Sequence, residues 1–195
     1  MTDLTEIRID GRGGQGNVVA AYMLAEAAFE AGRFAQAFPA FGPERRGAPV
    51  ASFVRISDRP VRRRCQIREP LYVIIQDPGL LHVAGAAQGV LPGGGVLINS
   101  PKTPEELGFS MPGRKVASLA AAAMATEFLG EPIPNTALVA ALITLTGLLP
   151  LTALEAALAR RFGGEALQRN LRLMRAAAER VPSGSWRGRG DASGN

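Results

Sequence analysis

The sequence lacks the side chains that hold redox metals. Its 195 residues include one cysteine, Cys65, and one histidine, His82. An iron–sulfur cluster requires about four thiolates, and a structural zinc ion requires about four cysteine or histidine ligands. The chain therefore cannot complete either kind of site alone. It also cannot form an intrachain disulfide, which suits the reducing cytoplasm.

A dyad of Cys65 and His82 is arithmetically possible, but the local sequence argues against it. Cys65 follows three arginines in an irregular segment, and His82 lies in a helix-like run. Both are better explained as ordinary core or surface side chains. Because the sequence also holds no Ser–His–Asp set and no evident acid–base pair, we expect no catalytic residue in this chain.

Long apolar runs and aromatic side chains are also scarce. The longest apolar candidate, residues 136–151, is interrupted by Pro150 and falls short of the ~18–20 residues of a membrane span. Only 6% of the residues are aromatic, and they are not interleaved with basic residues as on surfaces that stack nucleic-acid bases. The N-terminal segment carries acidic residues, unlike a signal peptide. We therefore expect a cytoplasmic protein with no membrane span and no nucleic-acid partner.

Positive charge is in excess, and almost all of it is arginine. The net charge is +5, and arginines cluster at residues 45–46, 59–64 and 160–161. Such a surface favours anionic partners, either a phosphate-bearing ligand or an acidic protein. For the arginines along residues 164–181 a solvated face is at least as good an explanation, because acidic residues are interleaved with them.

The first half of the chain alternates strand-like and helix-like patterns. A helix is expected over residues 17–32, ending at Gly32, and a short glycine-interrupted helix over residues 77–90. The expected strands cover residues 5–11, 34–41, 49–57, 71–77, 93–100 and 113–119. This alternation predicts an α/β fold, a Rossmann-like sandwich on a mostly parallel sheet.

The second half is predicted to be helical. Apolar residues recur at helical spacing over residues 120–130, 135–149, 151–164 and 164–181. Asn135 is the expected N-cap of the second of these helices. We expect residues 1–181 to form a single domain. Residues 182–195 are small, polar and without periodicity, and are expected to be a flexible C-terminal tail.

A glycine-rich loop follows the first expected strand. Gly11, Gly13 and Gly16 satisfy the G-x-G-x-x-G spacing of dinucleotide-binding loops, and the N–H groups that open the next helix can bind an anion. A dinucleotide site also needs an acidic residue ~20 positions further on, at the end of the second strand, and none is present there. Arg12 and Gln15 are long side chains where a pyrophosphate needs room. We therefore disfavour the ordinary dinucleotide interpretation.

A second unusual segment covers residues 38–50. Its three prolines stiffen the chain and its glycines permit sharp turns, so that Glu44, Arg45 and Arg46 are held on a rigid loop. In an open α/β sheet this loop can meet the glycine-rich loop at one edge. The expected function is a preorganised charged cluster that grips a carboxylate, a phosphate or a neighbouring subunit. The alternative is a stiff surface loop with solvated charges.

Two motifs together closely resemble the gamma subunit of 2-oxoacid:acceptor oxidoreductases, the family that includes pyruvate:ferredoxin oxidoreductase. They are GRGGQG at residues 11–16 and AQAFPAFGPERRGAPV at residues 35–50. The resemblance extends from about Ile7 to about residue 180, and FGPERRGAP looks more like the pyruvate type than the 2-oxoglutarate type. It places cofactor-binding or subunit-interface residues in both motifs: Gly11, Arg12, Gly13, Gly14, Gln15, Gly16, Phe41, Gly42, Pro43, Glu44, Arg45, Arg46 and Gly47.

The resemblance implies an oxidative decarboxylation, in which a 2-oxoacid and coenzyme A give an acyl-CoA, carbon dioxide and two electrons. It implies a complex of alpha-, beta-, gamma- and delta-type subunits. Thiamine diphosphate, Mg²⁺ and [4Fe–4S] clusters then belong to the other chains, and ferredoxin or another acceptor takes the electrons. The gamma-type chain binds no cofactor alone and supports assembly. Its glycine-rich loop is expected either to allow close packing or to bind an anion at a subunit junction near the active centre, and coenzyme A is the natural anionic candidate. The alternatives are a stand-alone nucleotide-binding protein and a purely structural assembly subunit.

The isolated chain is expected to be colourless and to contain neither iron nor thiamine, because its one cysteine cannot ligate a cluster. Metal analysis and an absorption spectrum of the purified, untagged chain check this expectation. Stoichiometric iron in that sample would contradict it.

Overall fold

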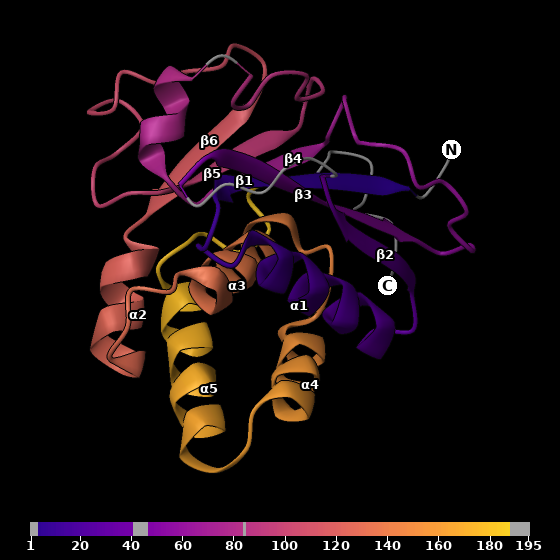
Figure 1. The fold of residues 1–195 in the computed structure, drawn as a ribbon, viewed down its shortest axis with the longest axis vertical. Coiled ribbons are helices and arrows are strands. Elements are labelled where there is room, and N and C mark those ends of the chain that lie inside the picture. The colour runs from indigo at the N-terminus through magenta and orange to yellow at the C-terminus, as the bar shows by residue number, and fades with distance from the viewer. Residues whose placement is uncertain (1–3, 41–46, 84, 188–195) are drawn as a thin grey trace.

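The computed structural model describes residues 4–40, 47–83 and 85–187 of the chain. In these residues one sheet carries α-helices on one of its sides (Figure 1). The strands are β1 (Thr5–Arg12), β2 (Phe34–Pro39), β3 (Pro49–Ser57), β4 (Tyr72–Ile75), β5 (Gly95–Asn99) and β6 (Lys115–Leu119). The helices are α1 (Asn17–Glu30), α2 (Ala121–Leu129), α3 (Asn135–Thr146), α4 (Leu151–Arg161), α5 (Gly164–Glu179) and the short 3₁₀ helix η1 (Pro78–His82).

The sheet has the strand order β2-β3-β1-β4-β5-β6. β1, β4, β5 and β6 are parallel to one another, and β3 runs antiparallel to both of its neighbours. The central strands β4 and β5 are continuous apolar runs because parallel strands are covered on both faces. The predicted α/β fold, with its mostly parallel sheet and helical C-terminal half, is therefore confirmed.

The helix expected after β4 is shorter than predicted. Only η1 forms, and the residues after it make turns. Three of them have positive φ, namely Gly85 at 102°, Ala87 at 57° and Gly89 at 75°, and a right-handed helix does not accommodate this conformation. By contrast, α1 ends as expected, because Gly32 has a φ of 74° and follows the C-cap residue.

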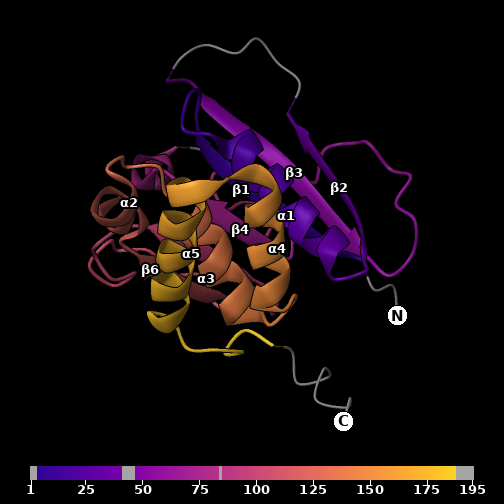
Figure 2. The same ribbon diagram turned by 90° about the horizontal axis from the view of Figure 1, so that it is seen from below.

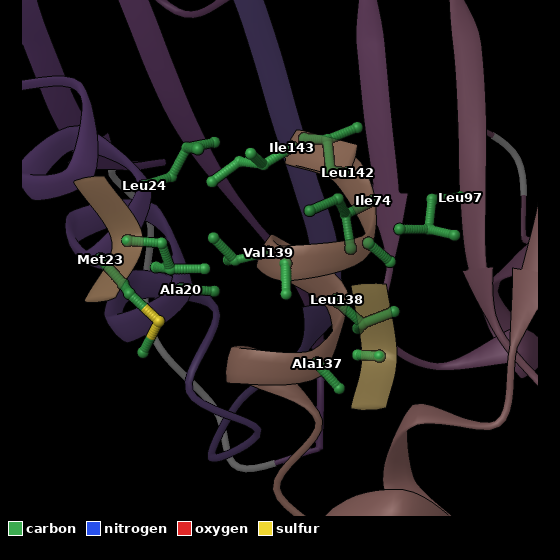
Figure 3. Packing of buried hydrophobic residues seen from close by; sticks show 14 of the residues in the cluster. Ala20, Met23, Leu24, Ile74, Leu97, Ala137, Leu138, Val139, Leu142 and Ile143 are labelled. Atoms are coloured by element: carbon green, nitrogen blue, oxygen red, sulfur yellow. The ribbon is translucent and has the colours of Figure 1, made fainter. Parts of the chain in front are cut away.

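The main core lies between the helices and the sheet, with α3 at its centre. Eleven of the twelve residues of α3 are buried, because this helix packs against the sheet as well as α1 and α5. Figure 3 shows its side chains between Met23 and Leu24 of α1 on one side and Ile74 and Leu97 of the sheet on the other. None of the helices in the described part of the chain is long and apolar enough to cross a membrane.

The opposite side of the sheet carries no α-helix among the described residues and is covered by η1 and connecting segments (Figures 1 and 2). Arg8 and Asp10 of β1 are buried on this side. Arg8 Nε donates to Asp10 Oδ2 at 3.0 Å, and its other nitrogens donate to the carbonyl groups of Gln88 and Gly85, so the turns after η1 are fastened to the strand. Burial raises the pKa of the Asp10 carboxyl, although Arg8 acts in the opposite direction.

Part of the expected flexible tail is packed on the core. Trp186 is 4% exposed and stacks on Tyr72, with the ring centroids 6.0 Å apart. Gly95 makes room for it, since an added Cβ would lie 2.6 Å from the indole ring. Trp186 of the expected tail therefore packs on the core, because its indole stacks on Tyr72 of the sheet. Residues 188–195 lie outside the described residues.

We expect Trp186→Ala to lower the free energy of unfolding by about 3–5 kcal/mol, because removal of the buried indole leaves a cavity at the end of the core. Trp186→Phe should cost less, since it keeps an aromatic ring over Tyr72. Urea unfolding measures both values. Trp186 is the only tryptophan, so native emission also reports its burial directly. Emission typical of a solvent-exposed indole in the folded chain would contradict the packing.

Candidate functional site

A large cavity opens at the carboxyl ends of β1, β4 and β5. The chain passes from β1 through α1 to strands on one side of β1, whereas it passes from β4 to strands on the other side. The strand order thus reverses between β1 and β4, which is where open α/β sheets bind ligands. The cavity volume is about 1090 Å³, at the upper limit of the ~300–1,000 Å³ of ordinary small-molecule sites.

The glycine-rich loop forms the inner rim of this cavity. A Cβ added at Gly11 would lie 2.3 Å from Asn17 Oδ1, and one added at Gly16 would lie 2.6 Å from Asn135 Nδ2. Gly14 differs, because it has a φ of 93° but nothing within 4 Å of an added Cβ. Two of the glycines therefore allow close packing within the chain, and the third allows the turn itself.

Arg12 and Gln15 tie the glycine-rich loop to the end of β4. Arg12 Nε donates to Asp77 Oδ2 at 2.6 Å, and Gln15 Nε2 donates to the same oxygen at 3.4 Å. Gln15 Oε1 in turn accepts from the backbone N–H of Arg12 at 2.8 Å. The carboxylate of Asp77 also caps η1 by accepting from Gly79 N at 2.8 Å. Both long side chains of the loop are thus engaged within the chain, where Arg12 offsets the charge of Asp77.

A chain of amides connects the glycine-rich loop, β4 and α3. Asn135 Nδ2 donates to the carbonyl oxygen of Gly16 at 3.2 Å, and Asn135 Oδ1 accepts from Gln76 Nε2 at 2.8 Å. Because a carbonyl oxygen only accepts, it fixes the orientation of both amides. Gln76 is 2% exposed and lines the cavity, yet its Oε1 has no partner among the described residues. An unpaired buried acceptor costs about 1–3 kcal/mol, so a ligand that donates a hydrogen bond would be stabilised here.

The prediction that Asn135 is an N-cap is wrong. Pro134 is at the N-cap, and Asn135 is the first residue of α3, where its amide bonds to more distant groups. Asn99, at the end of β5, makes a similar bridge. Its Nδ2 donates to the carbonyl oxygen of Gln76 at 2.9 Å, and its Oδ1 accepts from Ala122 N at 3.0 Å. Side-chain amides therefore orient the strand ends together with the ion pair between Arg12 and Asp77.

The outer wall of the cavity comes from the helices. Val19 and Met23 of α1 give it an apolar side, and Arg161 and Arg169 lie at its border. Arg169 pairs with Glu165, and Arg161 pairs with an acidic residue of α1 at 3.4 Å. Both arginines are therefore paired within the chain, whereas Glu131, which also lines the cavity, forms no ion pair with a described residue.

The structure brings the two sequence motifs together, as predicted. Gly13 N donates to Ala48 O at 3.0 Å, and Gly47 N donates to Gly13 O at 3.3 Å. Arg12 Nη1 also donates to Gly47 O at 3.2 Å. The other predicted residues of the second motif lie outside the described residues, so the charged cluster stays a prediction: Phe41, Gly42, Pro43, Glu44, Arg45 and Arg46.

Sequence reasoning missed Gln76 and Asn99 as site residues. The available signal was a polar residue at the carboxyl end of an apolar strand, since such ends gather at one edge of a parallel sheet. Asn135 was predicted only as the N-cap of a helix, and its hydrogen bonds to Gln76 and Gly16 were not predicted.

The geometry does not favour an ordinary dinucleotide or a metal ion. β3 separates β1 from β2, so the strand that follows α1 does not lie beside the glycine-rich loop. Neither β2 nor Gly47–Val50 contains an acidic residue to bind a ribose. In the part of the chain that the structure describes, no three His, Cys, Asp or Glu residues are grouped so that they could hold a metal ion.

Comparison with known proteins matches most of the chain. The family model "Pyruvate ferredoxin/flavodoxin oxidoreductase" matches residues 6–180. The common gamma subunit of pyruvate/ketoisovalerate oxidoreductases from Thermococcus litoralis is 44% identical over 180 residues, 91% of this chain and 97% of that protein. Pyruvate synthase subunit PorC from Methanocaldococcus jannaschii is 45% identical over 167 residues, 86% of this chain and 91% of that protein. The crystal structure of pyruvate oxidoreductase subunit PORC from Thermotoga maritima is similar with a TM-score of 0.79 at 36% identity, covering 91% of this chain and 96% of that one.

We expect Gly16→Ala to destabilise the chain more than Gly14→Ala. Both positions have positive φ, which costs a residue with a Cβ about 1–2 kcal/mol. Only at Gly16 does the new methyl group also collide with Asn135, and overpacking adds about 1–3 kcal/mol. Urea unfolding of the two variants compares the losses. Equal losses would mean that the Asn135 amide does not hold the loop as described.

Proposed function

The chain belongs to the pyruvate ferredoxin/flavodoxin oxidoreductase family, and from this we propose that it is the gamma subunit of a multi-subunit enzyme that oxidises a 2-oxoacid. The support is the match over residues 6–180 and the relatives named as gamma or PorC subunits. The proposed reaction converts a 2-oxoacid and coenzyme A into an acyl-CoA and carbon dioxide. The two electrons released pass to ferredoxin or another acceptor.

The proposed cofactors belong to partner chains. Thiamine diphosphate with Mg²⁺ supplies the carbanion chemistry when bound, and [4Fe–4S] clusters carry the electrons. The residues of this chain do not fit either group, since it has a single cysteine and its described acidic residues form no metal-binding group. We propose alpha-, beta- and delta-type subunits as the partners that hold them, and a cytoplasmic location for the complex.

The proposed role of this chain is to bind coenzyme A in the cavity beside the glycine-rich loop. The first turn of α1 has N–H groups without intrahelical acceptors, and those of Gly14 and Gly16 donate to no described residue. Together they form a site that favours the phosphate groups of such a ligand. The start of α1 lies on the same cavity as the unpaired acceptor of Gln76.

Gln76 is the observation that carries this proposal. Coenzyme A has amide and amino N–H groups as well as phosphates, so one molecule can donate to Gln76 Oε1 when binding uncovers this buried oxygen, while its phosphates accept from the loop. The apolar side of the cavity, with Val19 and Met23, would cover its carbon chain and exclude water. Glu44, Arg45 and Arg46 remain proposed members of this site, because Gly47 joins their loop to Gly13.

We expect Gln76→Leu to raise the apparent KM for coenzyme A about 5- to 10-fold in the assembled enzyme, because it removes one hydrogen bond to a buried acceptor. The kcat at saturating coenzyme A should stay close to that of the wild type, since no bond-breaking step uses Gln76. Steady-state kinetics with varied coenzyme A measure both constants.

Thr146→Val is the matched control for lost stability. Thr146 is also buried and donates to Leu142 O at 2.7 Å, but it does not line the cavity. This variant should lower the melting temperature without changing the KM for coenzyme A. If Gln76→Leu lowers stability as Thr146→Val does and leaves the KM unchanged, the cavity does not bind coenzyme A.

A further inference from the structure

The segment between β3 and β4, residues 58–69, carries much of the positive charge of the chain; we call it the basic loop. It contains five arginines and two acidic residues, so it supplies most of the net charge of +5. One of the two acids, Asp58, is already paired with Arg33 at 2.7 Å. The five arginines are all exposed, and none forms an ion pair with a described residue: Arg59, Arg62, Arg63, Arg64 and Arg68.

A buried arginine of β3 fixes the backbone of the basic loop. Arg55 is 1% exposed, and it donates from Nη1 to Arg63 O at 3.1 Å and from Nη2 to Cys65 O at 2.9 Å. Its Nε donates to Glu6 Oε1 at 2.7 Å, and its guanidinium carbon lies 5.4 Å from the ring centroid of Phe38. Burying a guanidinium is costly, and here the group holds a segment that has neither strand nor helix. The shape of the loop is therefore set before any partner arrives.

The fixed backbone leaves Arg62, Arg63 and Arg64 adjacent, and none of the three forms an ion pair with a described acid. A partner that brings negative charge would relieve the repulsion between them. It would also lose little conformational entropy on binding, because the loop is preorganised. Arginine suits carboxylates in particular, since the planar guanidinium matches two carboxylate oxygens.

The position of the basic loop separates it from the coenzyme A cavity. β3 ends beside the start of β1, with Ile56 opposite Thr5, so the loop begins at the end of the sheet opposite to the glycine-rich loop. It then lies over the side of the sheet that carries no described α-helix (Figures 1 and 2). A cavity of about 600 Å³ lies between the loop and β1 and β3, lined in part by Phe53 and Ile67. The sheet beneath the loop is already buried, so a partner would contact the exposed side chains of the loop itself and not the strands.

We propose that the basic loop is a docking surface for an acidic face of another protein subunit in the same complex. Protein carboxylates explain the loop better than nucleic acid does, because residues 58–69 contain no aromatic side chain for base stacking. A membrane surface is disfavoured too, since Ile67 is buried and Val61 is half-buried, so the loop exposes no apolar anchor. This inference rests on the proposed function only in that it requires a multi-subunit complex.

The test is assembly of the whole complex with R62E/R64E in this chain. The complex is captured through a tag on another subunit, and retention of this chain is measured as the salt concentration rises. We expect the variant to raise the apparent Kd about tenfold or more at low salt, because two attractive contacts become repulsive. The salt dependence of the remaining binding should also be weaker than that of the wild type.

R172E/R180E is the matched control, with the same change in net charge. Arg172 and Arg180 are exposed, lie on or next to α5, and form no ion pair with a described residue. This control should assemble as the wild type does. Circular dichroism of both double variants should match the wild type, because all four side chains are exposed.

Three results would overturn the proposal. One is equal retention of R62E/R64E and wild type at every salt concentration. Another is normal assembly of R62E/R64E with a raised KM for the electron-acceptor protein, which would assign the loop to that protein. The third is normal assembly with loss of binding to a labelled single-stranded RNA. Failure of even the wild-type chain to co-purify with other subunits would instead remove the proposed function itself.

Discussion

The side-chain amide of Asn135 joins three segments that are far apart in the sequence. It donates to the carbonyl oxygen of Gly16 and accepts from Gln76, and so it fixes the glycine-rich loop, the end of β4 and the start of α3 relative to one another. Gly16 must be glycine because this amide occupies the space that a Cβ would need. The same hydrogen bonds orient Gln76, whose Oε1 is left as an unpaired acceptor. The Asn135 amide therefore sets the position of the glycine-rich loop relative to α3 and the orientation of the Gln76 amide.

Much of the fold could be predicted because its signals are local. The apolar run at β4, the all-round apolar pattern of α3 and the glycine after α1 each specify an element without knowledge of the rest. The misses have tertiary causes. Trp186 looked like part of a polar tail because the ring on which it stacks, Tyr72, belongs to a distant strand. Gln76 and Asn135 are informative only as a pair, and nothing in the sequence says that they meet.

The proposed ligand site and the proposed docking surface of this gamma-type chain lie at opposite ends of the sheet. At the carboxyl ends of the parallel strands, backbone N–H groups and uncharged amides line the inner part of the cavity proposed for coenzyme A, and charged side chains of the helices lie at its border. At the other end, the buried Arg55 donates hydrogen bonds to the backbone of the basic loop and so holds its exposed arginines in place. A subunit that must bind a ligand and also fit a partner can separate the two tasks in this way, since charges needed for docking do not then compete with those of the ligand.

The most direct measurement of the central claim is photo-crosslinking of the assembled complex with a photoreactive coenzyme A analogue, followed by mass spectrometry of the labelled peptides. The account predicts labelling in this chain, within the glycine-rich loop and first turn of α1 or the segment that leads into α3, and competition by unmodified coenzyme A. Labelling that unmodified coenzyme A suppresses, but that occurs exclusively on the other subunits, would contradict the account.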